Sequence, residues 1–206
     1  MRRLADAVLA MASERDITNA SVAELTRRAG INRGTFYAHA PSPVVLLTRI
    51  LSAELDVVRG HTSDEMEADG FLYRDVARAT LDEIISHVEA RLDIYGGLDR
   101  ASSRYALRVV LAEHVEQSVL LVFRGGFAVA PIAGEAFAAM FAAYLAHGVV
   151  GAVEAWLQLP APRDHAILID ATEHMYPAWY APAPRRRADL PAIIPFTEEN
   201  DESCDT

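Results

Sequence analysis

The first part of the chain, residues 1–59, carries apolar residues at the three- and four-residue spacing of amphipathic helices. Over residues 2–15 the apolar positions are Leu4, Ala7, Val8, Met11 and Ala12. Over residues 43–59 they are Val44, Leu47, Ile50, Leu51 and Leu55. Each run predicts a helix with one buried face. Ser42 and Pro43 precede the second run as an N-cap and a first helical residue.

Two shorter helices are predicted between these runs, on either side of a tight turn. Ser21 and Glu24 form the capping box S-V-A-E, which starts a helix. Gly30 is expected to end that helix in a left-handed turn. Asn32 can then cap a further helix that runs to about Ala38. Two short helices joined by a glycine-containing turn are typical of a helix-turn-helix.

The rest of the chain continues the helical pattern. Helices are expected over residues 73–92, 102–123, 133–158 and 163–176. The polar stretch of residues 60–70 is expected to separate helices rather than to form one. No alternating strand pattern and no internal repeat is found. The sequence therefore predicts an all-α protein, with an N-terminal three-helix head joined by a linking helix to a larger helical body.

Residues 136–153 form an apolar stretch that is long enough to cross a membrane, with His147 as its only strongly polar side chain. Much of the stretch is alanine, and no basic cluster stands immediately beside either end. Its small residues would allow another helix to approach closely. We therefore expect a buried or dimer-interface helix, a homodimer and no membrane contact.

Charge is unevenly distributed along the chain. The 206 residues carry a formal net charge of −10 at pH 7, and all 19 basic residues are arginine. Residues 1–50 hold seven arginines against four acids, a net charge of +3, which leaves −13 on the remaining residues. A small basic head on a large acidic body is expected of a protein whose head contacts a polyanion.

Catalytic and metal-binding patterns are absent from the sequence. Cys204 is the only cysteine, and the seven histidines form no His-x-x-x-His pair of the kind that a helix-borne zinc site uses. No phosphate loop, nucleophile elbow or dinucleotide fingerprint is present. We expect no metal, no cofactor and no enzymatic activity. The amphipathic start of the chain lacks the features of a signal peptide, so the cytoplasm is the expected location.

The segment GINRGTFYAHA, residues 30–40, has the chemistry of a surface that meets DNA. In a helix-turn-helix its second helix can enter a major groove, with Arg33 and Thr35 at base edges and Tyr37 and His39 at phosphates. Gly34 would allow a close approach because it has no side chain. The full set of expected DNA-contacting residues is Ser21, Asn32, Arg33, Gly34, Thr35, Tyr37 and His39.

The sequence SVAELTRRAGINRGTFYAHAPSPVVLL resembles the DNA-binding head of the TetR family of bacterial transcriptional regulators. A fainter similarity, in GVVGAVEAWLQ of residues 148–158, is to the dimerisation helix of many members. Ala40 stands where the family usually has Phe, and Pro43 where it usually has Lys. The first change removes a packing aromatic, and the second removes one phosphate contact.

The resemblance implies a homodimer that binds a pseudo-palindromic double-stranded operator and senses a small molecule in its body. Aromatic and polar side chains of the central helices would line that effector cavity. The effector-binding residues expected are His114, Phe123, Phe141 and Tyr144. The predicted domains are a DNA-binding head (1–45), an effector-binding and dimerisation body (46–180) and an irregular, proline-rich acidic tail (181–206).

The function predicted on these grounds is a DNA-binding transcriptional regulator, a repressor that a small-molecule effector releases. Two alternatives stay open at this point. One is a helical dimerisation protein whose DNA-binding head is weakened by Ala40 and Pro43. The other is an enzyme of a type that its sequence motifs do not reveal.

Overall fold

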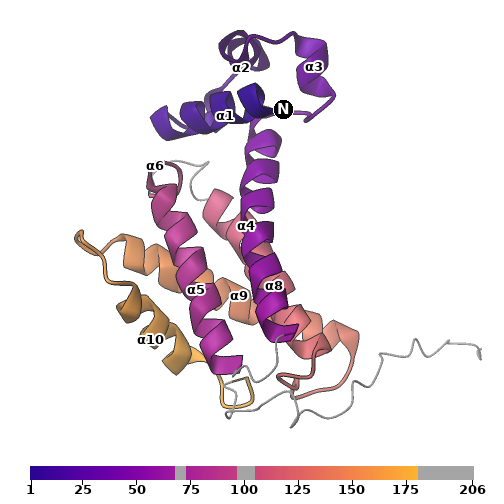
Figure 1. The fold of residues 1–206 in the computed structure, drawn as a ribbon, viewed down its shortest axis with the longest axis vertical. Coiled ribbons are helices and arrows are strands. Elements are labelled where there is room, and N and C mark those ends of the chain that lie inside the picture. Colours follow the sequence, from indigo (N-terminus) through magenta and orange to yellow (C-terminus); the bar gives the residue numbers. More distant parts are fainter. Residues whose placement is uncertain (68–72, 97–104, 181–206) are drawn as a thin grey trace, which may run out of the picture.

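The computed structural model of the protein describes residues 1–67, 73–96 and 105–180. Every regular element in these residues is helical, and no strand occurs among them. Figure 1 shows a small head of short helices above a larger body, with one long helix joining the two. The all-α prediction is confirmed. The predicted tail, residues 181–206, lies outside the described residues.

The head consists of three α-helices and a short 3₁₀ turn. These are α1 (Arg2–Glu14), η1 (Ile17–Asn19), α2 (Val22–Ala29) and α3 (Arg33–Tyr37). Their apolar faces form a small core of Leu4, Val8, Met11, Ile17, Leu25 and Phe36. Because the caps of α2 and α3 are local sequence signals, their bounds agree closely with the prediction.

Helix α4 (Pro43–Glu67) connects the head to the body and is longer than the sequence indicated. The prediction that it ends near Arg59 is wrong, because the polar residues that follow remain helical as far as Glu67. Thr62 and Ser63 donate hydrogen bonds to the carbonyls of Val58 and Arg59, which keeps these hydroxyls satisfied within the helix. The added turns extend α4 along the body.

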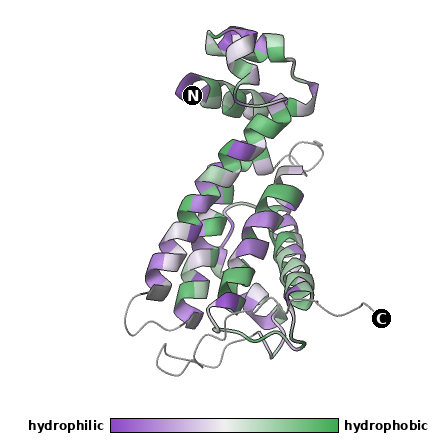
Figure 2. Cartoon of the chain, turned by 90° about the vertical axis from the view of Figure 1, so that its right-hand side faces the viewer, coloured by the Kyte–Doolittle hydropathy of each residue, from purple (hydrophilic) through white to green (hydrophobic). Residues whose placement is uncertain are grey.

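The body is a bundle of helices around α4. Its elements are α5 (Tyr73–Ala90), α6 (Leu92–Tyr95), the π-helical η2 (Ala106–Leu111), α8 (Ala112–Arg124), α9 (Glu135–Leu157) and α10 (His165–Met175). Helix α9 packs along α8, and α4 packs against both α5 and α8. Figure 2 shows hydrophilic and hydrophobic residues alternating along these helices, as amphipathic helices require.

Two predicted helices differ in detail from the structure. The helix expected over residues 73–92 ends at Ala90, and α6 begins after a turn at Arg91. The expected start of the helix predicted over residues 102–123 falls outside the described residues, and the described part contains the π-helical η2.

Helix α9 is long and apolar enough to cross a membrane, judged by length and composition alone. A core helix of a soluble protein passes the same test. Within the body, α9 buries Leu145, Val149, Val153 and Trp156, so its apolar character has an explanation in its packing.

Candidate DNA-binding interface

The turn between α2 and α3 is set by Gly30. This residue has φ 65° and ψ 37°, a left-handed conformation that side-chain-bearing residues rarely adopt. The N–H of Ile31 bonds the carbonyl of Thr26 at 3.0 Å, which closes the end of α2. At the other end of α2, the Ser21 hydroxyl accepts from the N–H of Glu24 at 3.1 Å. Both predicted ends of α2 are confirmed, and Ser21 lies exposed at the start of the helix.

Asn32 holds the start of α3. Its Oδ1 accepts from the backbone N–H of Thr35 at 2.8 Å and from the Thr35 hydroxyl at 3.1 Å. The predicted N-cap is therefore confirmed. The carbonyl of the Asn32 side chain is occupied within the protein, so only its amide NH₂ is left to reach outward.

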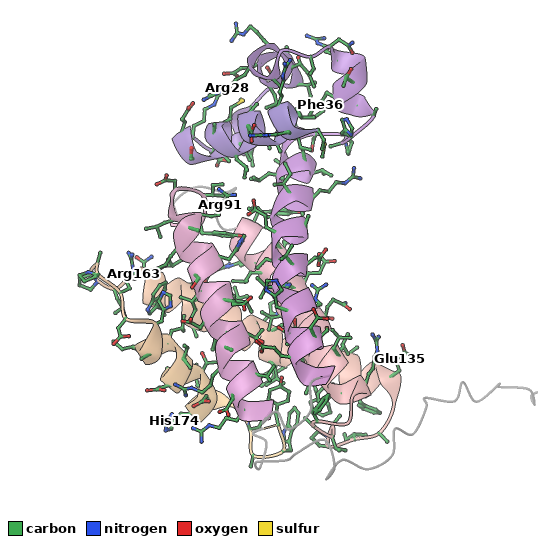
Figure 3. All side chains as sticks on the ribbon, viewed as in Figure 1. Arg28, Phe36, Arg91, Glu135, Arg163 and His174 are labelled. Carbon is green, nitrogen blue, oxygen red and sulfur yellow. The ribbon has the colours of Figure 1, made fainter. Side chains whose placement is uncertain are left out.

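Phe36 anchors α3 to the head. Its side chain is completely buried, and Figure 3 shows it between α3 and the rest of the head. The next residue, Tyr37, is 58% exposed and meets the Phe36 ring edge-to-face at a centroid distance of 5.4 Å. One face of this short helix is thus fixed by packing while the other faces outward.

The outward face of α3 brings most of the expected DNA-contacting residues together. Arg33, Gly34, Thr35 and Tyr37 are exposed there. His39 follows the helix and is half-buried, and its backbone carbonyl accepts a hydrogen bond from the Arg49 guanidinium. A polar, rigidly held face of this kind can donate to base edges and to phosphate oxygens.

Charge on the head is divided between paired and unpaired arginines. Arg28 pairs with Glu14, and this ion pair raises the pKa of Arg28 and lowers that of Glu14. Arg15 pairs with Glu24. Within the described part of the chain, an ion-pair partner is lacking for Arg2, Arg3, Arg27 and Arg33. The unpaired cations leave a net positive field on the head.

A hollow of about 260 Å³ lies between the start of α1 and α3. It is lined by Met1, Arg2, Arg3, Leu4, Ile31, Thr35 and His39. The sequence alone did not reveal that the first residues of the chain lie beside α3, because this proximity depends on how α1 crosses the head.

The two departures from the usual TetR pattern are both buried. Ala40 is 2% exposed and belongs to the apolar core. Pro43 is also buried and begins α4, and the Ser42 hydroxyl accepts from the N–H of Val45 at 3.3 Å. The small side chain of Ala40 therefore has a packed environment in this head, and the predicted start of α4 is confirmed.

A second hollow lies inside the body, between α4, α5, α8, α9 and the segment after α10. It has a volume of about 70 Å³. Its wall is mostly apolar, with residues such as Val76, Leu81, Ile84, Val119 and Val149. The hydroxyls of Thr62 and Thr80 lie 2.8 Å apart in the wall, and Ser118, Tyr176 and Tyr180 also line it. We call this hollow the central cavity.

The four residues expected to bind an effector do not meet at one place. His114 is buried one helical turn from Ser118 of the central cavity. Phe123 and Phe141 both lie against the Trp179 ring, at centroid distances of 6.3 and 5.1 Å. Tyr144 is 73% exposed on the outside of α9. Sequence reasoning missed Thr62 because it lies in the stretch expected to be non-helical.

Comparisons with known proteins agree with this architecture. The chain is similar over 90% of its length, and over 100% of the other chain, to the solved structure of RolR without ligand, with a TM-score of 0.56 and 19% sequence identity. At this identity the likeness concerns the fold. No curated protein matches the chain.

Residues 4–49 match the family described as bacterial regulatory proteins, tetR family. The matched range covers the whole helix-turn-helix and the start of α4. Proteins of this family are DNA-binding transcriptional regulators and not enzymes. The head of this chain is therefore similar, over residues 4–49, to the bacterial regulatory proteins of the tetR family.

Proposed function

We propose that the protein is a cytoplasmic repressor that binds a pseudo-palindromic operator as a homodimer and is released from it by a small-molecule effector. The observation that carries the DNA-binding part is the outward face of α3. That face is polar and exposed, is held by the Asn32 cap and the Phe36 anchor, and lies on a head with unpaired arginines.

In the proposed complex α3 lies in the major groove. Arg33 and Thr35 read base edges, and Tyr37 and His39 contact phosphates. Arg2 and Arg3, beside α3 across the hollow, add sequence-independent phosphate contacts. Two heads related by a two-fold axis would read two half-sites, which makes the operator pseudo-palindromic.

The test of this assignment is selection of bound sequences from random duplex DNA, followed by titration of the selected operator. Arg33→Ala is expected to reduce discrimination between operator and random DNA by roughly 1–3 kcal/mol. Arg124→Ala removes an exposed charge at the end of α8, in the body, and serves as the matched control. An unchanged specificity ratio in Arg33→Ala would show that Arg33 does not read bases. Failure to bind any duplex at low salt would favour the dimerisation protein with a weakened head.

The proposed dimer surface is the exposed face of α9. The exposed apolar residues there are Phe137, Met140 and Tyr144, and they continue along the helix to Gly148 and Gly151. Apart from its chain neighbours and the backbone of its own helix, a Cβ atom at either glycine would meet no atom of the described residues within 4 Å. The surface is therefore both apolar and open to close approach by a helix of a second subunit. An obligate dimer of this type buries roughly 2,000 Å² or more.

The dimer is tested by Gly148→Gln. In the single subunit this change meets no neighbouring atom and replaces glycine by a better helix former, so folding should be unaffected. In the proposed dimer the added side chain obstructs the interface. Gly60→Gln is the matched control, because Gly60 is an exposed glycine of α4 that also has open space around it. Sedimentation at micromolar concentration should show a monomer for Gly148→Gln alone. A wild-type monomer would refute the homodimer.

The proposed effector site is the central cavity. Its wall belongs to α4, α5, α8, α9 and the segment after α10, so a molecule bound there contacts α4 at Thr62, in the last turns of that helix. Because α4 continues directly from the head, a small shift of α4 changes the separation of the two recognition helices of a dimer. A tenfold loss of operator affinity requires only about 1.4 kcal/mol of differential binding.

The effector proposal is tested by thermal-shift screening of small molecules, followed by titration of each binder against the operator complex. Binders should lower operator affinity. A molecule that binds tightly in the central cavity and leaves operator affinity unchanged would refute the coupling while leaving DNA binding intact.

A further inference from the structure

His114 stands in a buried, polar position on α8. Only 2% of its surface is exposed, and its Nδ1 lies 3.0 Å from Nη2 of Arg59 on α4. An arginine guanidinium can only donate, so Nδ1 must accept and the imidazole proton is on Nε2. Burial, followed by the charge of Arg59, lowers the pKa of His114 to about 4. The ring is therefore neutral at pH 7, with an N–H at Nε2.

That Nε2–H has no acceptor. Among the described residues, Nε2 of His114 and Nε of Arg59 are both buried side-chain nitrogens without a hydrogen-bond partner. The other two nitrogens of the Arg59 guanidinium have partners. Nη1 donates to the carboxylate of Asp56 at 2.7 Å, and Nη2 donates to Nδ1 of His114. Buried donors are normally satisfied, so two unsatisfied ones on side chains that contact each other indicate a missing acceptor.

The residues that carry these donors do not line the central cavity themselves but lie about one helical turn from residues that do. Thr62 follows Arg59 by about one turn of α4, and Ser118 follows His114 by about one turn of α8. Both hydroxyl residues line the cavity, as does Val115, the neighbour of His114. Because α4 descends from the head in Figure 1, Arg59 lies on the head-proximal side of Thr62. The apolar wall and the donor pair together describe a site for an apolar molecule with a polar end.

We propose that the effector of the central cavity is a small apolar carboxylate whose oxygen accepts the Nε2–H of His114, beside the guanidinium of Arg59. The proposal deepens, and rests on, the proposed effector control. An acceptor-only group fits because both unsatisfied groups are donors. The Arg59 cation favours an anion, since its direct ion pair with Asp56 is screened by solvent, to which the Asp56 side chain is 59% exposed. The other titratable neighbour, His87, has its pKa lowered by burial and adds no compensating negative charge.

The test compares four probes that differ in their polar end: benzoate, isobutyrate, benzylamine and toluene. Thermal shift and calorimetry on the full chain should show that the two carboxylates bind and that benzylamine binds at least roughly tenfold more weakly than benzoate. This comparison uses the unmodified protein, so it does not depend on whether any variant folds.

Two variants of His114 then separate its two nitrogens. His114→Asn places an amide oxygen near the position of Nδ1, which keeps an acceptor for Arg59 but removes the Nε2 donor. His114→Gln places an amide nitrogen near the position of Nε2, which keeps the donor. Benzoate affinity should fall roughly tenfold to a hundredfold in His114→Asn and be largely retained in His114→Gln. Melting temperatures without probe report any change in folding.

The proposal is overturned by any of three results. The first is that neither carboxylate binds the wild-type protein, as would happen if water alone satisfied the donors. The second is that benzylamine or toluene binds as well as benzoate. The third is that the His114→Asn variant binds benzoate as tightly as the wild type does. Operator titration without probe is run in parallel. Operator binding with no carboxylate binding refutes this inference alone, whereas the expected binding pattern with unchanged operator affinity refutes effector control and leaves the site in place.

Discussion

Replacing Asn32 by alanine tests whether the N-cap of the recognition helix limits operator binding. Helix α3 spans only Arg33–Tyr37, so a single cap supports a large part of its hydrogen bonding. Asn32 Oδ1 accepts two hydrogen bonds, both from Thr35, at 2.8 and 3.1 Å. Loss of such a cap costs about 1 kcal/mol, roughly a fivefold change in the population of the formed helix. A dimer carries two such helices, so operator affinity should fall by roughly 25-fold.

Asn32→Ser is the matched control, because a serine hydroxyl can also accept from the backbone N–H of Thr35. Fluorescence anisotropy with labelled operator should show strong weakening for Asn32→Ala and a change within about twofold for Asn32→Ser. If the two variants weaken binding equally, the Asn32 amide itself contacts DNA and the capping argument is wrong. If neither weakens it, α3 is ordered by its other contacts alone.

Further predictions concern the core of the head and the stability of the body. Phe36→Ala removes a fully buried ring and should destabilise the head by about 3–5 kcal/mol in chemical denaturation, whereas Tyr37→Ala, at an exposed position, should weaken DNA binding with little effect on unfolding. His165 hydrogen-bonds Asp82 at 2.7 Å and Glu89 at 3.0 Å, and these bonds raise its pKa. A raised folded pKa stabilises the protein below the unfolded value of 6.5, and this contribution disappears as the pH rises through the folded pKa. The melting-temperature difference between wild type and His165→Gln should therefore shrink on going from about pH 6 to about pH 9; a difference that does not change with pH would contradict the assignment.

The helix-turn-helix could be predicted from the sequence because its signals are local. Ser21, Gly30 and Asn32 each fix a helix end through their own backbone or through a residue three positions away. Phe36 is one of the few strongly apolar side chains of residues 30–40, which is the sequence signal for its burial. The unpaired state of Arg33, in contrast to the pairing of Arg28 with Glu14, depends on how α1 and α2 cross and has no sequence signature.

The interior of the body could not be predicted in the same way. Thr62 reached the central cavity only because α4 continues through a polar stretch whose outward residues are solvated. Tyr144 was expected inside on account of its chemistry, yet the nearly uniform apolarity of α9 gives no sign of which face is buried. In such a helix the packing of α8 decides exposure within the subunit, and this packing is not encoded in periodicity.

The described residues show two main connections between the body and the head, and this arrangement bears on how a ligand signal could travel. Helix α4 is one, and the contact of α6 with α1 is the other. Two polar contacts tie the α6–α1 connection to α4. Glu54 of α4 pairs with Arg91, which follows α5. In addition, Nε2 of His87 on α5 lies 3.0 Å from the hydroxyl of the fully buried Tyr95 in α6. Burial raises the pKa of Tyr95 and lowers that of His87, so the His87–Tyr95 contact is a hydrogen bond between neutral groups at pH 7. Hydrogen bonds weaken steeply with distance and misalignment, so a displacement of α5 relative to α6 breaks this contact rather than weakening it gradually. A ligand that separates α4 from α5 at the central cavity would act on both connections at once, because α5 and α4 are the two walls that this polar cluster bridges.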